Sequence, residues 1–336
     1  MAVRKKADMK PVILVTGGAG YIGSHAVREL RRKGYRPLVY DNLSTGHQWA
    51  IRQDELIKGD LGDKGHVEEI LHKEKPLAVM HFAASAIVTE SVERPELYFR
   101  NNVINSFNLL EAMLTAEVKS FIFSSSAAVY GNPQQIPITE DHPLVPINPY
   151  GEAKVFVERA LRWYEEAHGL TYISLRYFNA AGADPEAELG EAHNPETHLI
   201  PRILDVAAGK RPYIELYGTD YDTSDGTCIR DYIHVTDLAQ AHILALEALL
   251  NDSRGRVYNL GNQRGFSVKE VIDVARLVTG HPIPVQESSR RQGDPPVLVA
   301  SSERIKRELG WKPLYSDLSV IIETAWKWMG RKGNKG

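Results

Sequence analysis

A glycine-rich loop directly after the first strand-like run is the feature that most constrains the fold of this chain. The apolar run Val12–Thr16 leads into Gly17, Gly20 and Gly23, and helical periodicity begins at about Ile22. Between a strand and a helix, such glycines permit a tight turn, let backbone N–H groups approach a pyrophosphate and allow the helix to pack closely on the strand. The spacing therefore predicts a dinucleotide-binding unit at the start of the chain.

Short β-rich runs alternate with helical patterns through the first half of the chain, and several of the runs are apolar throughout. This alternation predicts a parallel sheet with helices on both faces, and wholly apolar runs are typical of strands buried on both sides. The expected strands are Val12–Thr16, Pro37–Tyr40, Glu55–Lys58, Ala78–Phe82, Phe121–Ser124 and Tyr172–Tyr177. The expected helices are His25–Lys33, Val67–His72, Leu97–Ala116 and Gly151–His168. We therefore predict an α/β fold with a Rossmann-type doubly wound parallel sheet.

The second half of the chain differs from the first in composition and pattern. Residues 180–201 are rich in Gly, Pro, Asp and Glu, and such a long irregular stretch is usually functional. Further expected elements are the strands Arg256–Leu260 and Ile283–Gln286 and the helices Ser267–Thr279, Glu303–Leu309 and Ser316–Met329. We predict a dinucleotide-binding domain of residues 11–180 plus about 232–264 and a flexible tail of residues 1–10. Residues 181–231 plus about 265–336 would form a smaller, discontinuous α/β substrate-binding lobe.

The overall charge excludes some classes of partner. With 40 Lys and Arg against 43 Asp and Glu, the chain has no general field that would attract nucleic acid or an anionic membrane. The basic start of the chain precedes an apolar run that is too short for a signal core or a membrane span. Cys228 is the only cysteine, and the 12 histidines form no H-x-x-x-H or H-E-x-x-H pair. We expect a soluble cytoplasmic protein without a disulfide or a metal site.

A carboxylate at the end of the second expected strand bears on the choice of cofactor. Asp41 lies about 20 residues beyond the glycine loop, where a carboxylate accepts hydrogen bonds from an adenosine ribose and repels a 2′-phosphate. No arginine follows closely to reverse that preference, so we expect NAD rather than NADP. Asp60 ends the third expected strand, where contact with the adenine and capping of a helix both stay open as roles.

One tyrosine carries the pattern of a catalytic base. Tyr150 is the only one of 15 tyrosines with a lysine four residues on, which is Lys154. Asn148 and Pro149 are typical of an N-cap and a first helical position, so both side chains would lie on one face of the first turns of a helix. A phenol with an ammonium one turn away can take the proton of a carbinol while NAD takes the hydride.

The expected surroundings of Tyr150 should lower its pKa. A free tyrosine titrates near ~10. The ammonium of Lys154, a positive nicotinamide and the helix N-terminus all favour the phenolate. The strand Phe121–Ser124 runs on into further serines, and we expect the hydroxyl of Ser126 to share the substrate's proton with Tyr150.

Taken together, these residues resemble the extended short-chain dehydrogenase/reductase family and, within it, the UDP-glucose 4-epimerases. The likeness covers essentially the whole chain after Lys10. Its strongest stretches are Val15–His25, Ser124–Gly131, Asn148–Gly151, Leu175–Asn179 and Arg230–Val235.

The resemblance implies a complete site for NAD. Its residues would be Gly17, Gly20, Tyr21, Ile22, Gly23, Asp41, Asn42, Asp60, Leu61, Phe82, Ala83, Asn101, Ser124, Tyr150, Lys154 and Tyr177. Among them Lys154 would hold the nicotinamide ribose and tune Tyr150.

The resemblance also implies a UDP-sugar site, in which Ser126 and Tyr150 would handle the proton of the C4 hydroxyl. The other contacts would come from Asn179, Arg230 and Arg291 at the diphosphate, Tyr217 on the uracil, Asp294 at its ribose, His198 and Leu199 before Pro201, and Leu298 at the sugar gate. The arginines also make chemical sense, since a diphosphate needs fixed, fork-shaped donors.

The reaction so implied is the reversible 4-epimerisation of UDP-glucose and UDP-galactose. NAD would take hydride from C4, the 4-keto sugar would turn about its diphosphate anchor, and hydride and proton would return on the other face. Three positions depart from the family pattern: Ala86 replaces a lysine near the cofactor ribose, His198 replaces an asparagine, and Leu298 is intermediate between the bulky and small gate residues. UDP-N-acetylglucosamine and UDP-pentoses therefore stay open as substrates.

Other functions fit the sequence less well. A 4,6-dehydratase needs an Asp-Glu pair where this chain has Ala127 and Ala128. A non-catalytic NAD-binding regulator would not need the Tyr/Lys pair, which is present. The resemblance further implies a homodimer formed through the helices Leu97–Ala116 and Gly151–His168.

Overall fold

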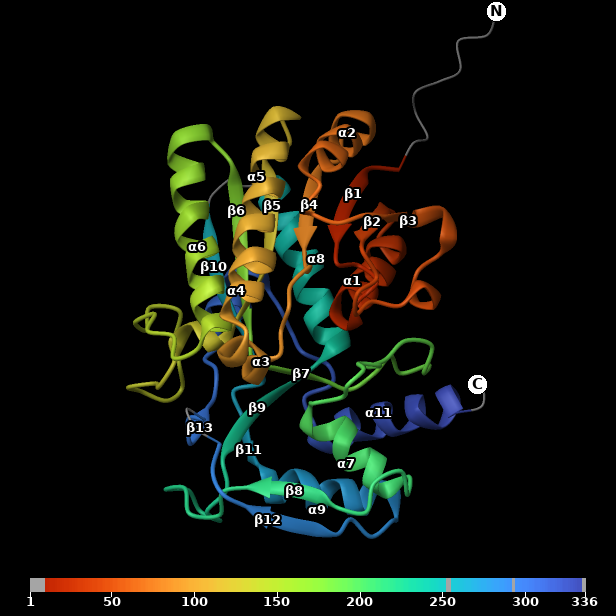
Figure 1. Cartoon of the computed structure of the whole chain (residues 1–336), viewed down its shortest axis with the longest axis vertical. Coiled ribbons are helices and arrows are strands. Elements are labelled where there is room, and N and C mark those ends of the chain that lie inside the picture. The colour runs from red at the N-terminus through yellow and green to blue at the C-terminus, as the bar shows by residue number, and fades with distance from the viewer. Residues whose placement is uncertain (1–9, 252–254, 292–293, 334–336) are drawn as a thin grey trace, which may run out of the picture.

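The computed structural model describes residues 10–251, 255–291 and 294–333 of the chain. Its main element is a seven-stranded sheet in the order β10-β6-β5-β4-β1-β2-β3, in which every neighbouring pair is parallel (Figure 1). The strands are β1 (Val12–Thr16), β2 (Arg36–Asp41), β3 (Leu56–Lys58), β4 (Ala78–His81), β5 (Ser120–Ser126), β6 (Thr171–Tyr177) and β10 (Arg256–Leu260). The prediction of a doubly wound parallel sheet is confirmed.

Helices cover both faces of this sheet. One face carries α1 (Tyr21–Arg32), α8 (Val235–Asn251) and α10 (Glu303–Leu309), and the other carries α2 (Lys64–Glu74), α5 (Asn105–Thr115) and α6 (Pro149–His168). Successive residues of a strand point to opposite faces, so Ile13 and Val15 join one core cluster while Leu14 joins the other. Because both faces are buried, the strands are apolar without alternation.

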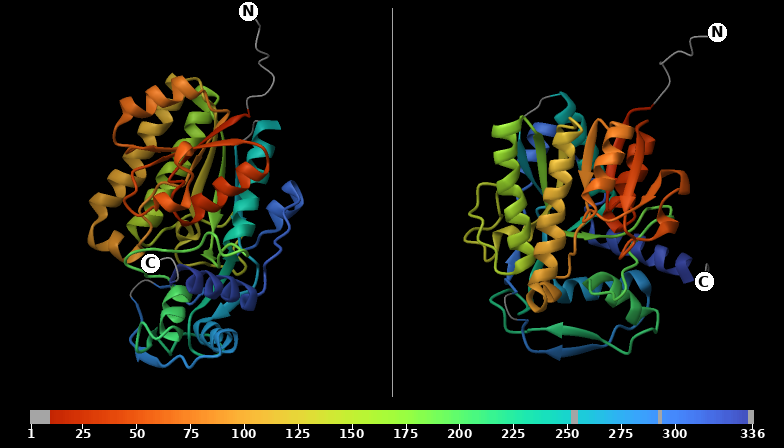
Figure 2. Two further views of the ribbon diagram at one scale, coloured as in Figure 1. Left: turned by 90° about the vertical axis from the view of Figure 1, so that its right-hand side faces the viewer. Right: turned by 45° about the horizontal axis from the view of Figure 1, so that its top comes forward.

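A smaller part of the chain lies beyond the carboxyl ends of the large sheet (Figures 1 and 2). Its four-stranded sheet contains β7 (Asn179–Ala181), β9 (Ile229–His234), β11 (Gly265–Ser267) and β13 (Val297–Leu298), and its two-stranded sheet pairs β8 (Ile214–Tyr217) with β12 (Val285–Ser288). Its core is filled by α7 (Leu199–Ala207), α9 (Val268–Thr279) and α11 (Leu318–Gly333). The shorter elements are η1 (Gln48–Ala50), η2 (Gln53–Glu55), α3 (Val88–Glu93), α4 (Pro95–Tyr98), the π-helical turn η3 (Phe99–Ile104) and η4 (Ala127–Tyr130).

Local sequence sets the ends of α6. The Asn148 side chain accepts a hydrogen bond from the backbone N–H of Gly151 at 2.8 Å, and Pro149 takes the first helical position. Gly169 ends the helix with φ +64°, which glycine adopts without a steric penalty. A side-chain cap of this kind stabilises a helix by about 1 kcal/mol. The expected helix is confirmed, and so is the prediction of Asn148 as its N-cap and Pro149 as its first residue; the apolar pattern alone indicates a start two residues later.

Some elements differ from the sequence prediction. Helix α8 was not predicted from the sequence, because most of this helix is buried and no one-sided apolar stripe marks it. The strand expected at Ile283–Gln286 begins instead at Val285, since Pro284 has no N–H to give to a ladder. The prediction that residues 180–201 are irregular is wrong at both ends of this stretch, where β7 and α7 lie. The predicted flexible tail lies outside the described residues except for Lys10.

No helix among the described residues is long and apolar enough to cross a membrane.

A buried ion pair joins α6 to β6. The Arg176 guanidinium meets the Glu158 carboxylate at 2.5 Å, and both side chains are 5% exposed. Ser125 donates a hydrogen bond to Glu158, and Arg176 donates one to the hydroxyl of Tyr130 at 2.8 Å. Because every charge here has a partner, the pair holds the helix against the sheet without an uncompensated buried charge.

Replacing Glu158 with alanine should lower the free energy of unfolding by about 3–5 kcal/mol, because Arg176 would remain buried without a counter-charge. Urea unfolding followed by circular dichroism measures the change. Glu166→Ala is the matched control, since Glu166 pairs with Arg162 at 3.3 Å on the exposed side of the same helix. The control should change stability by at most about 1 kcal/mol, and equal losses in the two variants would contradict this account.

Candidate active site

The glycine loop between β1 and α1 is packed too closely to accept a side chain. Gly17 has φ +71°, and a Cβ there would lie 2.4 Å from the backbone nitrogen of Ala83 at the end of β4. A Cβ at Gly23 would lie 2.3 Å from the carbonyl oxygen of Gly17. Gly20 is less crowded, with the nearest atom to an added Cβ at 3.3 Å. The loop therefore brings backbone, not side chains, to the edge of the sheet.

The start of α1 suits an anion. Its N-cap is Gly20, so no side chain caps the first turn of the helix. The backbone N–H groups of a first helical turn have no partner within the helix, and their dipoles favour negative charge. Tyr21 and Ile22, the first two residues of α1, line the cavity described below. This helix N-terminus fits the pyrophosphate of a dinucleotide.

Asp41 lies at the end of β2, where its carboxylate accepts hydrogen bonds from the backbone N–H groups of Ala19 at 2.9 Å and Leu43 at 2.8 Å. Burial raises the pKa of this carboxyl group, and the two hydrogen bonds oppose the rise. Nearby, the Asn42 amide donates to the Asp60 carboxylate at 2.7 Å. These acceptors fit the hydroxyls of a ribose.

A cavity of about 480 Å³ runs along the carboxyl ends of the central strands. Every residue predicted to contact the cofactor lines it: Gly17, Gly20, Tyr21, Ile22, Gly23, Asp41, Asn42, Asp60, Leu61, Phe82, Ala83, Asn101, Ser124, Tyr150, Lys154 and Tyr177. Three of the residues predicted to contact the substrate, Ser126, Asn179 and His198, line the same cavity. The strand ends, the glycine loop and α6 thus meet at one site.

Tyr150 and Lys154 lie side by side in this cavity. The Lys154 ammonium donates a hydrogen bond to the backbone carbonyl of Ser124 at 2.8 Å and lies 5.7 Å from the centre of the Tyr150 ring. Burial lowers the pKa of Lys154 to about 7, although the charge of Glu158 opposes this.

The expectation of a lowered pKa for Tyr150 is wrong for this structure. Burial raises the pKa of its phenol, and the hydrogen bond with Ser126 offsets only part of the rise. The cost of placing a phenolate in a buried site outweighs the nearby ammonium, which is directed at the Ser124 carbonyl. Burial therefore favours the neutral phenol, and the phenolate that can accept a proton needs a compensating positive charge or hydrogen-bond donor beside it.

The remaining predicted substrate contacts form a second group in the smaller part of the chain. Arg230, on β9, forms an ion pair with Asp294. The Arg291 guanidinium lies 4.0 Å from the centre of the Tyr217 ring, whose hydroxyl donates to Glu215 at 2.7 Å. These side chains do not line the cavity that contains Tyr150.

Two leucines of the predicted substrate site also lie in the smaller part of the chain. Leu298, on β13, pairs in register with Arg230 on β9, so the residue predicted at the sugar gate lies beside a residue predicted at the diphosphate. Leu199 begins α7 and packs against the core of the smaller part, directly after His198.

Part of the cavity wall was not predicted from the sequence. Glu191, His193 and Thr197 line it, and so do Thr45 and Ser85 from loops after β2 and β4. The spacing E-x-H-x-x-E-x-H over residues 191–198 is a signal that could have been found, because charged and imidazole side chains recur at short intervals in an otherwise irregular stretch.

Comparison with known proteins shows to which family this chain belongs. It belongs to the NAD dependent epimerase/dehydratase family, whose pattern matches residues 13–261.

Several relatives are similar over nearly the whole chain. A UDP-glucose 4-epimerase of Halalkalibacterium halodurans is 52% identical over 316 residues, which is 94% of this chain and 95% of that protein. The crystal structure of UDP-glucose 4-epimerase from Brucella ovis in complex with NAD is 51% identical, with a TM-score of 0.93 over 95% of this chain and 98% of that one. The enzyme of Bifidobacterium longum in complex with NAD+ and UDP is 38% identical, with a TM-score of 0.91 over 97% of this chain and 100% of that one.

Gly17→Ala should destabilise the protein more than Gly209→Ala, although both glycines have φ +71°. An alanine forced into this conformation costs about 1–2 kcal/mol at either position. At Gly17 the new Cβ would also collide with the backbone at Ala83, whereas nothing lies within 4 Å of a Cβ at Gly209. Chemical unfolding of the two variants measures the difference, and equal losses would show that the contact between β1 and β4 is unimportant.

Proposed function

We propose that this protein catalyses the NAD-dependent interconversion of UDP-glucose and UDP-galactose by inverting the configuration at C4. One observation carries the proposal: Tyr150, Ser126 and Lys154 line the same cavity as the glycine loop and Asp41. A hydroxyl that enters this cavity would therefore meet proton-transfer groups next to the cofactor. The similarity to UDP-glucose 4-epimerases over nearly the whole chain supports the same function.

The fit of the cavity to NAD rests on its backbone and its acceptors. The close-packed loop at Gly17 and the uncapped start of α1 would hold the pyrophosphate, and Asp41 would hold the adenosine ribose. Lys154 would hold the nicotinamide ribose. When bound, NAD supplies reversible uptake of hydride from C4 of the sugar.

The chain's own side chains would manage the proton of the C4 hydroxyl. As the phenolate, Tyr150 would accept this proton when the hydroxyl is oxidised, and the phenol so formed would return it when the 4-keto group is reduced, with Ser126 sharing the proton between them. Lys154, held by the Ser124 carbonyl at 2.8 Å, would position the phenol and stabilise the charge that develops on it. The same groups serve both directions, so the reaction is reversible.

We propose that the second group of side chains anchors the nucleotide while the sugar is left free to turn. Arg230 and Arg291 would meet the diphosphate with Asn179, and Tyr217 would stack on the uracil. Asp294 would contact the uridine ribose, and His198 and Leu199 would line the diphosphate end of the nucleotide site. Leu298 would limit the size of the sugar substituent, so the range of sugars beyond UDP-glucose and UDP-galactose depends on this side chain.

We propose that these two binding roles belong to two domains. Residues 11–180 plus about 232–264 would bind NAD, and residues 181–231 plus about 265–336 would bind the sugar nucleotide. The cytoplasmic location expected from the sequence stays a prediction.

The direct test is incubation of the purified protein with UDP-galactose, without added NAD, and separation of the products by anion-exchange chromatography. An equilibrium mixture with UDP-glucose is expected. No conversion, even after NAD is added, would refute the proposed function.

Tyr150→Phe should reduce the rate of epimerisation by about 10²–10⁴-fold, because removing the phenolic hydroxyl removes the proton-transfer group. The variant should keep its fold, since the ring that packs against Tyr98 remains. Tyr213→Phe is the matched control, because Tyr213 is exposed and lies outside the cavity. If the Tyr150→Phe variant epimerises at the rate of the control, a residue other than Tyr150 transfers the proton.

We also propose that two chains form a homodimer through α5, α6 and the turn η3 that precedes α5. These helices run side by side at the surface (Figure 2). Large apolar side chains are exposed along them: Phe156 and Trp163 on α6 are 46% and 61% exposed, and Ile104 ends η3. Exposed apolar side chains gathered on adjacent helices are typical of a protein–protein interface.

Phe156→Glu combined with Trp163→Glu should therefore convert the dimer to a monomer, because two carboxylates would be buried at the interface. Size-exclusion chromatography with light scattering measures the mass. Leu277→Glu, at an exposed leucine of α9, is the control and should leave the dimer intact. A wild-type protein with the mass of one chain would contradict the dimer.

A further inference from the structure

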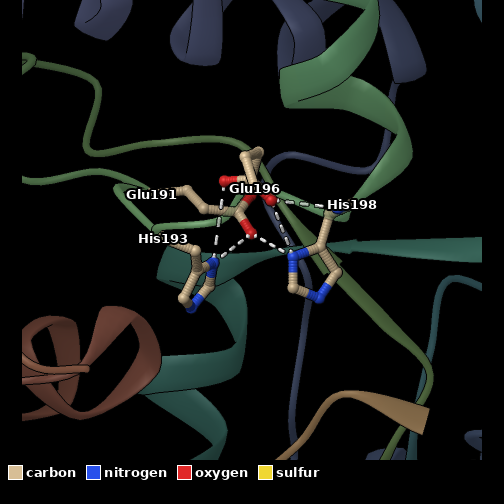
Figure 3. Close-up of side chains that lie close together, drawn as sticks. All are labelled: Glu191, His193, Glu196 and His198. Carbon is tan, nitrogen blue, oxygen red and sulfur yellow. Dashed lines mark hydrogen bonds and ion pairs between the residues drawn. The ribbon is translucent and has the colours of Figure 1, made fainter. Parts of the chain in front are cut away.

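Four side chains of the loop between β7 and α7 converge on one point. Glu191, His193, Glu196 and His198 come from a segment of eight residues, and we call them the 191–198 cluster. In Figure 3 both histidines turn one ring nitrogen, Nδ1, toward the two carboxylates and the other nitrogen away from them. The cluster does not include Tyr150, Ser126 or Lys154, the residues proposed for proton transfer.

The four side chains are close enough together to share one metal ion. From the Glu191 carboxylate, the Nδ1 atoms of His193 and His198 lie at 3.0 Å and 2.7 Å. From the Glu196 carboxylate the same two nitrogens lie at 3.7 Å and 3.1 Å. One ligand atom from each residue lies within 4.8 Å of all the others. Four ligands around zinc, each about 2.0–2.2 Å from the ion, lie about 3.3 Å from one another.

The two carboxylates are poorly exposed, with 7% of the Glu191 side chain and 12% of the Glu196 side chain accessible. Buried carboxylates need a cation. No lysine or arginine of the described residues forms an ion pair with either one, and their only ion-pair partners there are the two histidines. The backbone N–H groups of Thr197 and His198 each donate to the Glu196 carboxylate at 2.9 Å, which fixes its orientation.

A second acidic group in the same loop provides a contrast. Asp184, Glu186 and Glu188 also lie close together, but Arg28 fills the space between them with contacts of 2.6, 2.8 and 3.4 Å. That group already has its cation and needs no metal. The 191–198 cluster has two imidazoles in the corresponding place, and an imidazole is a metal ligand as well as a cation.

We propose that Glu191, His193, Glu196 and His198 bind one divalent transition-metal ion, with zinc as the best fit. Two imidazole nitrogens with two carboxylates form a four-ligand set that suits zinc, whereas magnesium and calcium prefer oxygen ligands alone. The two carboxylates neutralise the charge of the ion. This proposal replaces the expectation of no metal site, which considered histidine pairs at helical spacing and cysteine clusters only.

The ion would act by positioning the loop. It would tie residues before and after Pro195 to one another, and the cavity wall contains this turn together with Glu191, His193 and His198. The ion would therefore hold the wall of the sugar-nucleotide site at the start of α7. It would not contact Tyr150 or take part in proton transfer.

The test uses the full-length protein, dialysed first against EDTA and then against metal-free buffer, and titrated with CoCl₂. Cobalt in a four-ligand site has strong visible absorption bands. We expect these bands to saturate at one cobalt per chain and to disappear when ZnCl₂ is added. A protein that gives no band and retains no zinc through gel filtration would overturn the proposal.

Glu191→Gln and His193→Gln identify the ligands. Glutamine is close in size to both side chains and stays polar but is a poor zinc ligand, so each change should weaken zinc binding by at least about 10-fold. His72→Gln, at an exposed histidine of α2, is the control and should bind zinc like the wild type. Cobalt bands of wild-type strength in both cluster variants would also overturn the proposal. If a variant fails to fold, the cobalt titration of the wild-type protein still tests whether the metal site exists. That titration uses no UDP-sugar, so its result does not depend on the outcome of the epimerase assay.

Discussion

The close contact between the backbone at Gly17 and the backbone at Ala83 is the constraint on which the site depends. It joins the ends of β1 and β4, which are neighbours in the sheet but are separated by β2 and β3 in the chain. The strand order reverses between these two strands, and in open α/β sheets a crevice opens at that point. A side chain at Gly17 would push the two strand ends apart, so glycine there is a condition of the site.

Burial sets the chemistry of this crevice. It lowers the pKa of Lys154 to about 7 and raises that of Tyr150, so both groups are pushed toward their neutral forms. Charge develops on either one only against a compensating partner, such as a second charge or a hydrogen-bond donor at the same place. With such a partner in place, one proton can be shared between the Tyr150 oxygen and the C4 oxygen of the substrate. The buried pair of Glu158 and Arg176 holds α6, and with it Tyr150, at a fixed distance from the sheet.

The sequence predicted the parts of the fold in which local pattern and burial agree. β1, β10 and α10 lie at their expected bounds, and the glycine loop and Tyr150 lie on one cavity because β-strand ends and a helix N-terminus have strong local signals. Most strands of the smaller part were missed, since they are short and their partners are distant in the chain. The pKa of Tyr150 was predicted in the wrong direction because the degree of burial depends on tertiary packing. The loop at residues 191–198 was missed because its four polar groups come together only through a turn.

The central claim is that C4 of the sugar loses and regains the same hydride within one site. The most direct measurement is the fate of deuterium when the protein converts UDP-galactose labelled with deuterium at C4. The account predicts that the UDP-glucose formed keeps the label at C4, because the hydride returns to the carbon from which it came. Loss of the label to solvent would contradict the account, since it would mean that C4 exchanges a proton with water.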